Sequence, residues 1–181
     1  MTKTAREGRP RFTGVSTYQD PLGRFTFRYP WDWHQYDLDG DREGVMFAPE
    51  EPPDTYFAAW VSKLDEHVVA EDLDVLREGV EAGLAQLANY QVEKAKDDVL
   101  SNLVKIERIY TFDDGGTTRK RRVWILYVDT WQMVLVFQGA TPEDYHYWLP
   151  MGNYIFATFQ LPEALWFATD RDLRAYDSYD G

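Results

Sequence analysis

Between residues 103 and 139, apolar and polar positions alternate with the period of two that is typical of β-strands. Leu103–Phe112 is apolar on one face and carries charged or hydroxyl side chains on the other, which predicts a half-exposed strand. Thr117–Val128 begins in the same way, but its second half is apolar on both faces, and so is Trp131–Phe137. A strand that is apolar on both faces needs a cover on both faces of its sheet.

Two short polar segments separate these three strands. Asp113–Gly116 supplies residues that tolerate positive φ, as a hairpin turn requires, and Asp129–Thr130 forms the second turn. Connections this short join antiparallel strands, because parallel pairing requires a crossover of about a dozen residues or more. The pattern therefore predicts an α+β fold, an α/β/α sandwich in which a central antiparallel sheet has helices on both faces.

Further strands are predicted before this three-stranded segment. Arg24–Tyr29 places aromatic side chains inward and polar side chains outward, and a proline ends the strand. Short strands are expected at Trp33–Tyr36 and Gly44–Ala48, with a polar hairpin tip between them, and a longer strand at Thr55–Lys63.

Two later segments show helical patterns. Asp65–Tyr90 contains apolar residues at helical spacing that predict one buried stripe: Leu73, Leu76, Val80, Leu84 and Leu87. Gly79 and Gly83 lie on or near this stripe, so we expect them to let the helix approach the sheet closely. Thr141–Asp144 predicts a capped helix start, and Pro150 is expected to kink or interrupt that helix.

Aromatic and turn residues in the first part of the chain resemble the PsbP/Mog/DcrB-like superfamily. The pattern is Tyr18…Asp20-Pro21…Gly23…Phe25-Thr26-Phe27…Tyr29-Pro30…Trp33. With the following strand, helix and three-stranded segment, the resemblance covers Tyr18 to Leu161. The superfamily includes an extrinsic subunit of photosystem II, a Ran-binding nuclear-transport factor and bacterial proteins without a settled role. The resemblance implies an α/β/α sandwich and a tendency to bind partners, and it supplies no active-site motif.

These features predict a single PsbP/Mog-like domain over residues 18–161, preceded by a flexible basic lead over residues 1–17. Residues 162–181 lie beyond this domain and form a C-terminal arm or tail. Leu165, Trp166 and Phe167 precede an acidic end of the chain. One interpretation is an arm that docks on a second copy, giving a homodimer, or on another partner. The alternative is that these three residues cover the molecule's own sheet or helix.

Charge and composition exclude several classes of function. The 181 residues include 19 basic and 31 acidic side chains, a net charge of −12 that disfavours generic binding to nucleic acid or anionic lipid. The chain has no cysteine, which excludes disulfides, thiolate nucleophiles and cysteine metal sites. The polar start of the chain resembles neither a signal peptide nor a membrane anchor. We therefore expect a cytoplasmic protein of bacterial type that has no membrane partner.

Catalytic and metal-binding motifs find little support. His34, His67 and His146 are far apart, and none lies in a zinc-protease spacing. The acidic segment Asp37–Glu43 has its glycine at position 4, whereas an EF-hand loop needs it at about position 6. No serine lies in the motif of a nucleophile elbow. We expect neither enzyme activity nor a bound cofactor or metal.

Two sets of residues are candidates for binding. One is an aromatic cluster that could line a pocket if the last helix packs near the first strands: Trp31, Trp33, Trp60, Tyr145 and Trp148. The other is the basic run 119–122, in which Arg119 and Arg121 point opposite to their neighbours and are candidates for contact with an acidic partner. We expect a non-catalytic protein that acts by protein–protein interaction, and the alternative is a small-ligand-binding protein that uses the aromatic pocket.

Overall fold

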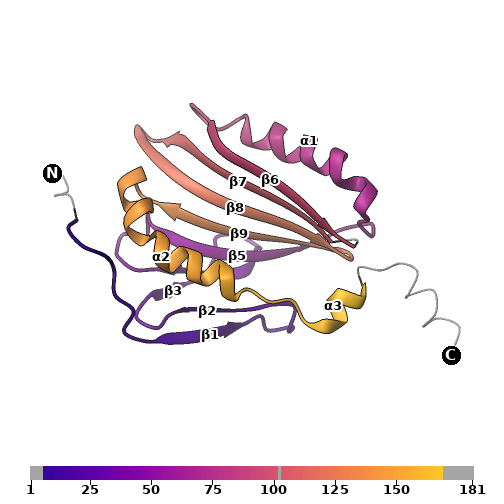
Figure 1. Ribbon diagram of the computed structural model, residues 1–181, viewed down its shortest axis with the longest axis horizontal. Helices are drawn as coiled ribbons and strands as arrows, with labels where there is room; N and C mark the ends of the chain where they lie inside the picture. The colour runs from indigo at the N-terminus through magenta and orange to yellow at the C-terminus, as the bar shows by residue number, and fades with distance from the viewer. Residues whose placement is uncertain (1–5, 102, 169–181) are drawn as a thin grey trace, which may run out of the picture.

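The computed structural model describes residues 6–101 and 103–168, with side chains described as far as Leu165. Its main element is a seven-stranded antiparallel sheet with the strand order β3-β4-β5-β9-β8-β7-β6 (Figure 1). The first four of these strands in chain order are β3 (His34–Tyr36), β4 (Glu43–Ala48), β5 (Tyr56–Lys63) and β6 (Gln91–Leu100). The last three are β7 (Leu103–Asp114), β8 (Thr117–Val128) and β9 (Trp131–Gly139).

The three consecutive strands expected between residues 103 and 139 are confirmed. Each pairs antiparallel with the next, and the turns lie where the polar segments predicted them. Gly115 and Gly116 have φ values of 57° and 83°, and Asp129 has 57°. This left-handed region suits glycine and is tolerated by aspartate, which explains why the hairpins form at these residues.

A separate two-stranded hairpin precedes the main sheet, formed by β1 (Val15–Gln19) and β2 (Thr26–Pro30). The structure differs here from the flexible lead expected over residues 1–17, because β1 begins inside that stretch. Tyr18 of β1 stacks on Phe27 of β2 with ring centroids 5.2 Å apart. Arg6 also contacts the domain, with its guanidinium 4.9 Å from the ring centroid of Tyr147.

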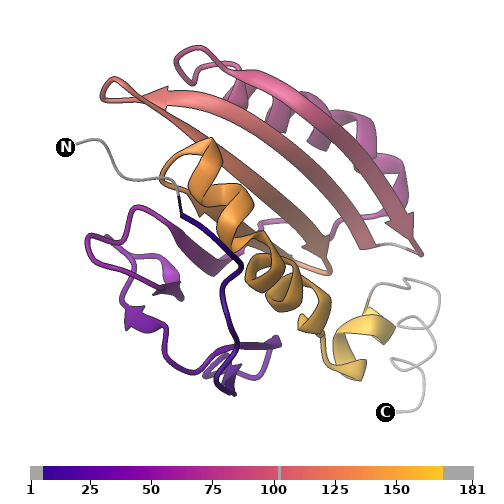
Figure 2. The ribbon, with the colours of Figure 1, turned by 60° about the vertical axis from the view of Figure 1, so that its left-hand side comes forward.

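The helix α2 (Pro142–Thr158) packs with the β1–β2 hairpin on one face of the sheet (Figures 1 and 2). Thr141 caps it as expected, accepting a hydrogen bond from the backbone of Asp144. Of the two outcomes expected at Pro150, a kink or an interruption, the interruption is wrong, because the helix continues through this residue. Pro150 is exposed, so water can replace the backbone donor that proline lacks. Gly152 brings the helix close to the sheet, since a Cβ there would lie 2.8 Å from the Phe137 ring.

On the opposite face lie a short 3₁₀ turn, η1 (Ala70–Asp72), and the helix α1 (Leu73–Leu84). The expected stripe of this helix packs on β-strand side chains such as Ile106 and Tyr127, whereas the alternate residues of the same strands face α2. Gly79 and Gly83 do not provide close packing, because a Cβ on either would meet no atom within 4 Å. That expectation is wrong.

The expected antiparallel sheet is confirmed, but a complete sandwich with helices over both faces is not. On the α1 side, Met46 and Trp60 are only half-buried, and the guanidinium of Arg42 lies over the Trp60 ring at 5.1 Å. A last short helix, α3 (Glu163–Ala168), follows α2. Among the described residues, none of the helices combines the length and apolar character needed to cross a membrane.

Candidate functional site

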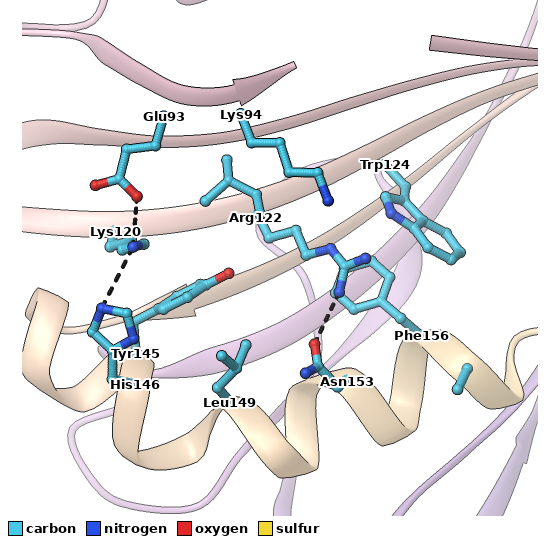
Figure 3. A pocket seen from close by; sticks show the side chains of 12 residues that line it. Glu93, Lys94, Lys120, Arg122, Trp124, Tyr145, His146, Leu149, Asn153 and Phe156 are labelled. Carbon is cyan, nitrogen blue, oxygen red and sulfur yellow. Dashed lines mark hydrogen bonds and ion pairs between the residues drawn. The ribbon is translucent and has the colours of Figure 1, made fainter. Parts of the chain in front are cut away.

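A groove of about 740 Å³ lies between α2 and the strands β6, β7 and β8 (Figure 3). The strands contribute Glu93, Lys94, Ile109, Lys120, Arg122 and Trp124 to its wall. The helix contributes Tyr145, His146, Leu149, Asn153, Phe156 and Ala157. The helix runs beside β9 and β8, while β7 and β6 extend beyond it, so one wall of the groove is helix and the other is sheet (Figure 1).

The groove is cationic in an otherwise acidic protein. Its lining includes the cations Lys94, Lys120 and Arg122 against the single carboxylate of Glu93, on a chain whose net charge is −12. A fourth cation, Lys105, lies with its Nζ 4.0 Å from the centroid of the Trp124 ring in the lining and 3.8 Å from Asp98 Oδ2. When Asp98 and the buried Glu107 are included, these four cations face three carboxylates. A local excess of positive charge in an acidic protein favours an anionic occupant.

Arg122 is held in place by a buried carboxylate beneath the groove. Glu107 is 3% exposed and accepts hydrogen bonds from Arg122 Nη2 at 2.9 Å and from the indole of Trp124. Burial acts to raise the pKa of Glu107, but the hydrogen bonds from Arg122 and Trp124 prevail and lower it. Arg122 also donates to Asn153 Oδ1 of α2 at 3.0 Å. Glu107 is therefore ionised at neutral pH, and Arg122 links the sheet to the helix.

Lys120, at the end of the groove near the start of α2, pairs with a far more exposed acid than Arg122 does. Its Nζ lies 2.6 Å from Glu93 Oε2 and 3.5 Å from His146 Nε2 (Figure 3). The ring of Tyr145 lies beneath it, with the centroid 5.0 Å from Nζ. Burial raises the pKa of Tyr145 to about 12, so its hydroxyl is neutral at physiological pH.

Apolar side chains form the middle of the groove. Ile109 and Leu149 are half-buried, and Trp124 packs on Phe156 with ring centroids 4.7 Å apart. The groove thus offers an amine at one end and an apolar surface beside it. This combination can bind a carboxylate together with a neighbouring apolar group.

The five aromatic residues expected to converge do not share one pocket. Trp33 and Trp148 meet edge to face at 5.9 Å, and they line a separate cavity of about 130 Å³. Tyr145 lines the groove, Trp60 lies on the α1 side of the sheet, and Trp31 is 57% exposed. The cluster is divided because its members lie on different parts of the fold. Trp31 and Trp33 lie in the connection between β2 and β3, Trp60 is on the α1 face of β5, and the other two are on α2.

The basic run on β8 has the alternation that its sequence predicted. Arg119 Nε lies 2.8 Å from Asp114 Oδ2 at the end of β7, and Arg121 donates to Gln138 Oε1 at 2.5 Å. Both side chains are thus engaged within the protein. The two intervening cations, Lys120 and Arg122, are the ones that reach the groove.

The candidate residues of the C-terminal arm are described only in part. Leu165 packs against the core on the α2 side of the sheet. The side chains of Trp166 and Phe167 lie outside the described residues, as does the acidic end over residues 169–181. Docking of this arm on a second copy stays a prediction.

The three histidines occupy unrelated places. His34 is exposed on β3, His67 Nε2 lies 3.1 Å from Asp129 Oδ1, and His146 lines the groove. Within residues 6–101 and 103–168, no group of three or more histidine, aspartate or glutamate side chains could hold a metal ion.

Sequence reasoning missed the groove, although one signal for it was present. Lys120, Arg122 and Trp124 follow one another at a period of two, which places two cations and an aromatic ring in a row on one face of β8. What the pattern does not contain is the position of α2, which decides that this row faces a groove. Glu93 and Lys94 gave no comparable signal.

Comparison with known proteins gives structural matches. No family model matches the sequence, and neither does any curated protein. The structure is similar to CyanoP, the cyanobacterial PsbP of Synechocystis sp. PCC 6803, with a TM-score of 0.58 and 13% identity, covering 86% of this chain and 99% of that one. It is also similar to LpqN, involved in cell envelope biogenesis of Mycobacterium tuberculosis, with a TM-score of 0.59 and 13% identity, covering 82% and 91%.

A third match is the Ran-binding protein Mog1p of Saccharomyces cerevisiae, with a TM-score of 0.52 and 11% identity, covering 88% of this chain and 98% of that one. Together the three matches establish a PsbP/Mog-like fold. At these identities they establish the fold alone.

Proposed function

For a chain with a PsbP/Mog-like fold, we propose a non-catalytic role in the cytoplasm, in which the groove beside α2 binds a protein partner. The observation that carries this proposal is the concentration of cations beside an apolar surface, on a chain with a net charge of −12. The side chain of Lys94 is 56% exposed at the rim, where it can meet a partner without rearrangement.

The fold is compatible with such a role. Mog1p, which has the same fold, is a Ran-binding protein. The groove of this chain is an independent feature, because it is defined by this chain's own cations and by its own helix.

Affinity capture with a charge-reversal variant tests the proposal. Lys94→Glu places a carboxylate at the rim, and we expect the variant to lose a partner that the wild-type chain retains. Arg42→Glu is the matched control, because it makes the same charge change at an exposed position on the α1 side of the sheet. Retention of the same partner by both variants would contradict the proposal.

A small anionic ligand is the second candidate. The groove volume of about 740 Å³ lies within the range of roughly 300–1,000 Å³ that is usual for ligand sites. The cavity at Trp33 and Trp148, about 130 Å³, is below that range, which moves the small-ligand alternative away from the aromatic cluster. A thermal-shift screen of small carboxylates tests it, and a hit that Lys94→Glu removes would favour this candidate.

A further inference from the structure

Lys120 is the least accessible of the groove's lysines, and its charge is balanced by one half-exposed acid. The Lys120 side chain is 10% exposed, whereas that of Glu93, which binds it at 2.6 Å, is 46% exposed. A carboxylate that arrives from solution can therefore replace Glu93 at the amine, and Glu93 can return to water at little cost.

The backbone explains why Glu93 reaches the groove. The pairing of β6 with β7 shifts register between Val92 and Lys94, so Glu93 is the extra residue of a bulge. Bulges re-aim a side chain, and Figure 3 shows the Glu93 carboxylate directed toward Lys120. Because β6 is the edge strand of the sheet, no further strand of the described chain holds Glu93 in this position.

Arg122 provides the contrast. Its guanidinium is shared between Glu107, which is 3% exposed, and Asn153 of α2. Displacing Glu107 from Arg122 would leave a buried carboxylate without its nearest cation, which is costly. Lys120 is therefore the position in the groove where an incoming carboxylate can exchange with an internal one.

We propose that the groove binds an extended acidic segment of a partner protein, one of whose carboxylates displaces Glu93 from Lys120. This inference rests on the proposed function and specifies the chemistry of the occupant. The adjoining subsite is apolar, formed by Ile109, Leu149 and Phe156.

The spacing of the subsites sets the sequence of the segment. Ile109 is opposite Arg122, which follows Lys120 by two residues on β8, so the backbone position of the apolar subsite is about 7 Å along the strand direction from that of Lys120. The side chains of an extended peptide that are two residues apart have the same separation of about 7 Å. The occupant therefore has an aspartate or glutamate two positions from an apolar residue, in either chain direction.

Peptide titration tests the displacement. The probe is a fluorescent nine-residue peptide, Asp-Ser-Leu-Ser-Asp-Ser-Leu-Ser-Asp, which presents Asp and Leu two positions apart in both chain directions. The control peptide has Asn in place of Asp. The Glu93→Gln variant removes the internal competitor, and we expect it to bind the probe about fivefold more tightly than the wild-type chain does. Lys120→Gln is expected to bind at least about tenfold more weakly, with thermal unfolding recorded to show that it is folded.

The direction of the Glu93→Gln effect is decisive, because a damaged fold does not strengthen binding. The inference would be overturned if Glu93→Gln bound the probe no more tightly than the wild-type chain, or if the Asn control peptide bound as tightly as the probe. It would also be overturned if no variant bound at 1 mM peptide, since a dissociation constant of about 1 mM is already weak for specific binding. In that event, if Lys94→Glu still lost the captured partner and Arg42→Glu retained it, the proposed function would stand. Failure of this inference and failure of the proposed function are therefore distinguishable.

Discussion

Glu107 and Arg108 are neighbours on β7, and their side chains enter opposite faces of the same sheet. Arg108 is 2% exposed and is enclosed by acids, with Nη1 2.7 Å from Asp97 Oδ1 and Nε 2.7 Å from Glu81 Oε1 of α1. Glu107 is equally buried, but the cations around it include Lys94, whose side chain is 56% exposed at the groove. One buried charge is sealed beneath a helix, and the other lies at the base of an open site.

This difference separates stability from binding. On the α1 side the ions link helix to sheet, because Asp97 binds both Arg108 and Arg77 of α1. Burial acts to raise the pKa of Asp97, but hydrogen bonds from Arg108 and Arg77 prevail and lower it. On the α2 side Glu107 binds Arg122 at 2.9 Å, whereas Lys94 lies 3.7 Å from Glu107 and is exposed enough to meet a ligand.

The largest expected effect is that of removing the sealed charge. Arg108→Met leaves Asp97 of β6 without its buried partner, and we expect the free energy of unfolding to fall by about 3 kcal/mol. Urea denaturation measures this loss. The control is Arg77→Gln, which alters the more exposed cation of the same network and should cost much less. If the two variants lost the same free energy of unfolding, burial of Arg108 would not be what stabilises the α1 side.

Glu107→Gln should have the next largest effect, and one that depends on pH. The folded state holds the pKa of Glu107 below its usual 4.5, so the ionised carboxylate contributes fully to the free energy of unfolding at neutral pH. That contribution declines as the pH falls below this value and is lost once the pH passes the folded pKa. We expect the variant to be less stable by about 2 kcal/mol at pH 7, a gap that narrows in acid. A gap that is constant between pH 7 and pH 3 would contradict this account.

A pair of glycine substitutions compares the packing of the two helices. Gly152→Ala forces a Cβ against Phe137 and should lower the free energy of unfolding by about 1–2 kcal/mol. Gly79→Ala meets open space on α1 and should raise it by up to about 1 kcal/mol through helix propensity. Thermal unfolding of both variants measures the difference. Changes of the same sign would show that the two helices approach the sheet alike.

Much of the fold could be predicted from local patterns. The alternation in residues 103–139 and the turn residues around Gly115 predicted the antiparallel strands, and Thr141 predicted the start of α2. The strand β1 was missed because Val15–Gln19 has few apolar residues and becomes stable only by pairing with β2. The expectation for Gly79 failed because a sequence does not show which glycine of a helix faces its neighbour.

The groove could not be predicted for a related reason. The period of two on β8 identifies Lys120 and Arg122 as residues of one face, but the space above them depends on the position of α2. The role of Glu93 depends on a bulge in β6, and the local sequence Val92-Glu93-Lys94 carries no signal for one. Long-range packing decides both features.

Site-specific cross-linking tests the central claim most directly, because the chain has no cysteine of its own. A photoreactive thiol label is placed in the groove by Ala157→Cys and on the outer face of α1 by Val75→Cys, where the native residue is 73% exposed. In lysate of the source organism, the account predicts a specific cross-linked partner from the Ala157→Cys variant and none from the Val75→Cys variant. Cross-linking to the same partner from the α1 position, with none from the groove, would contradict it.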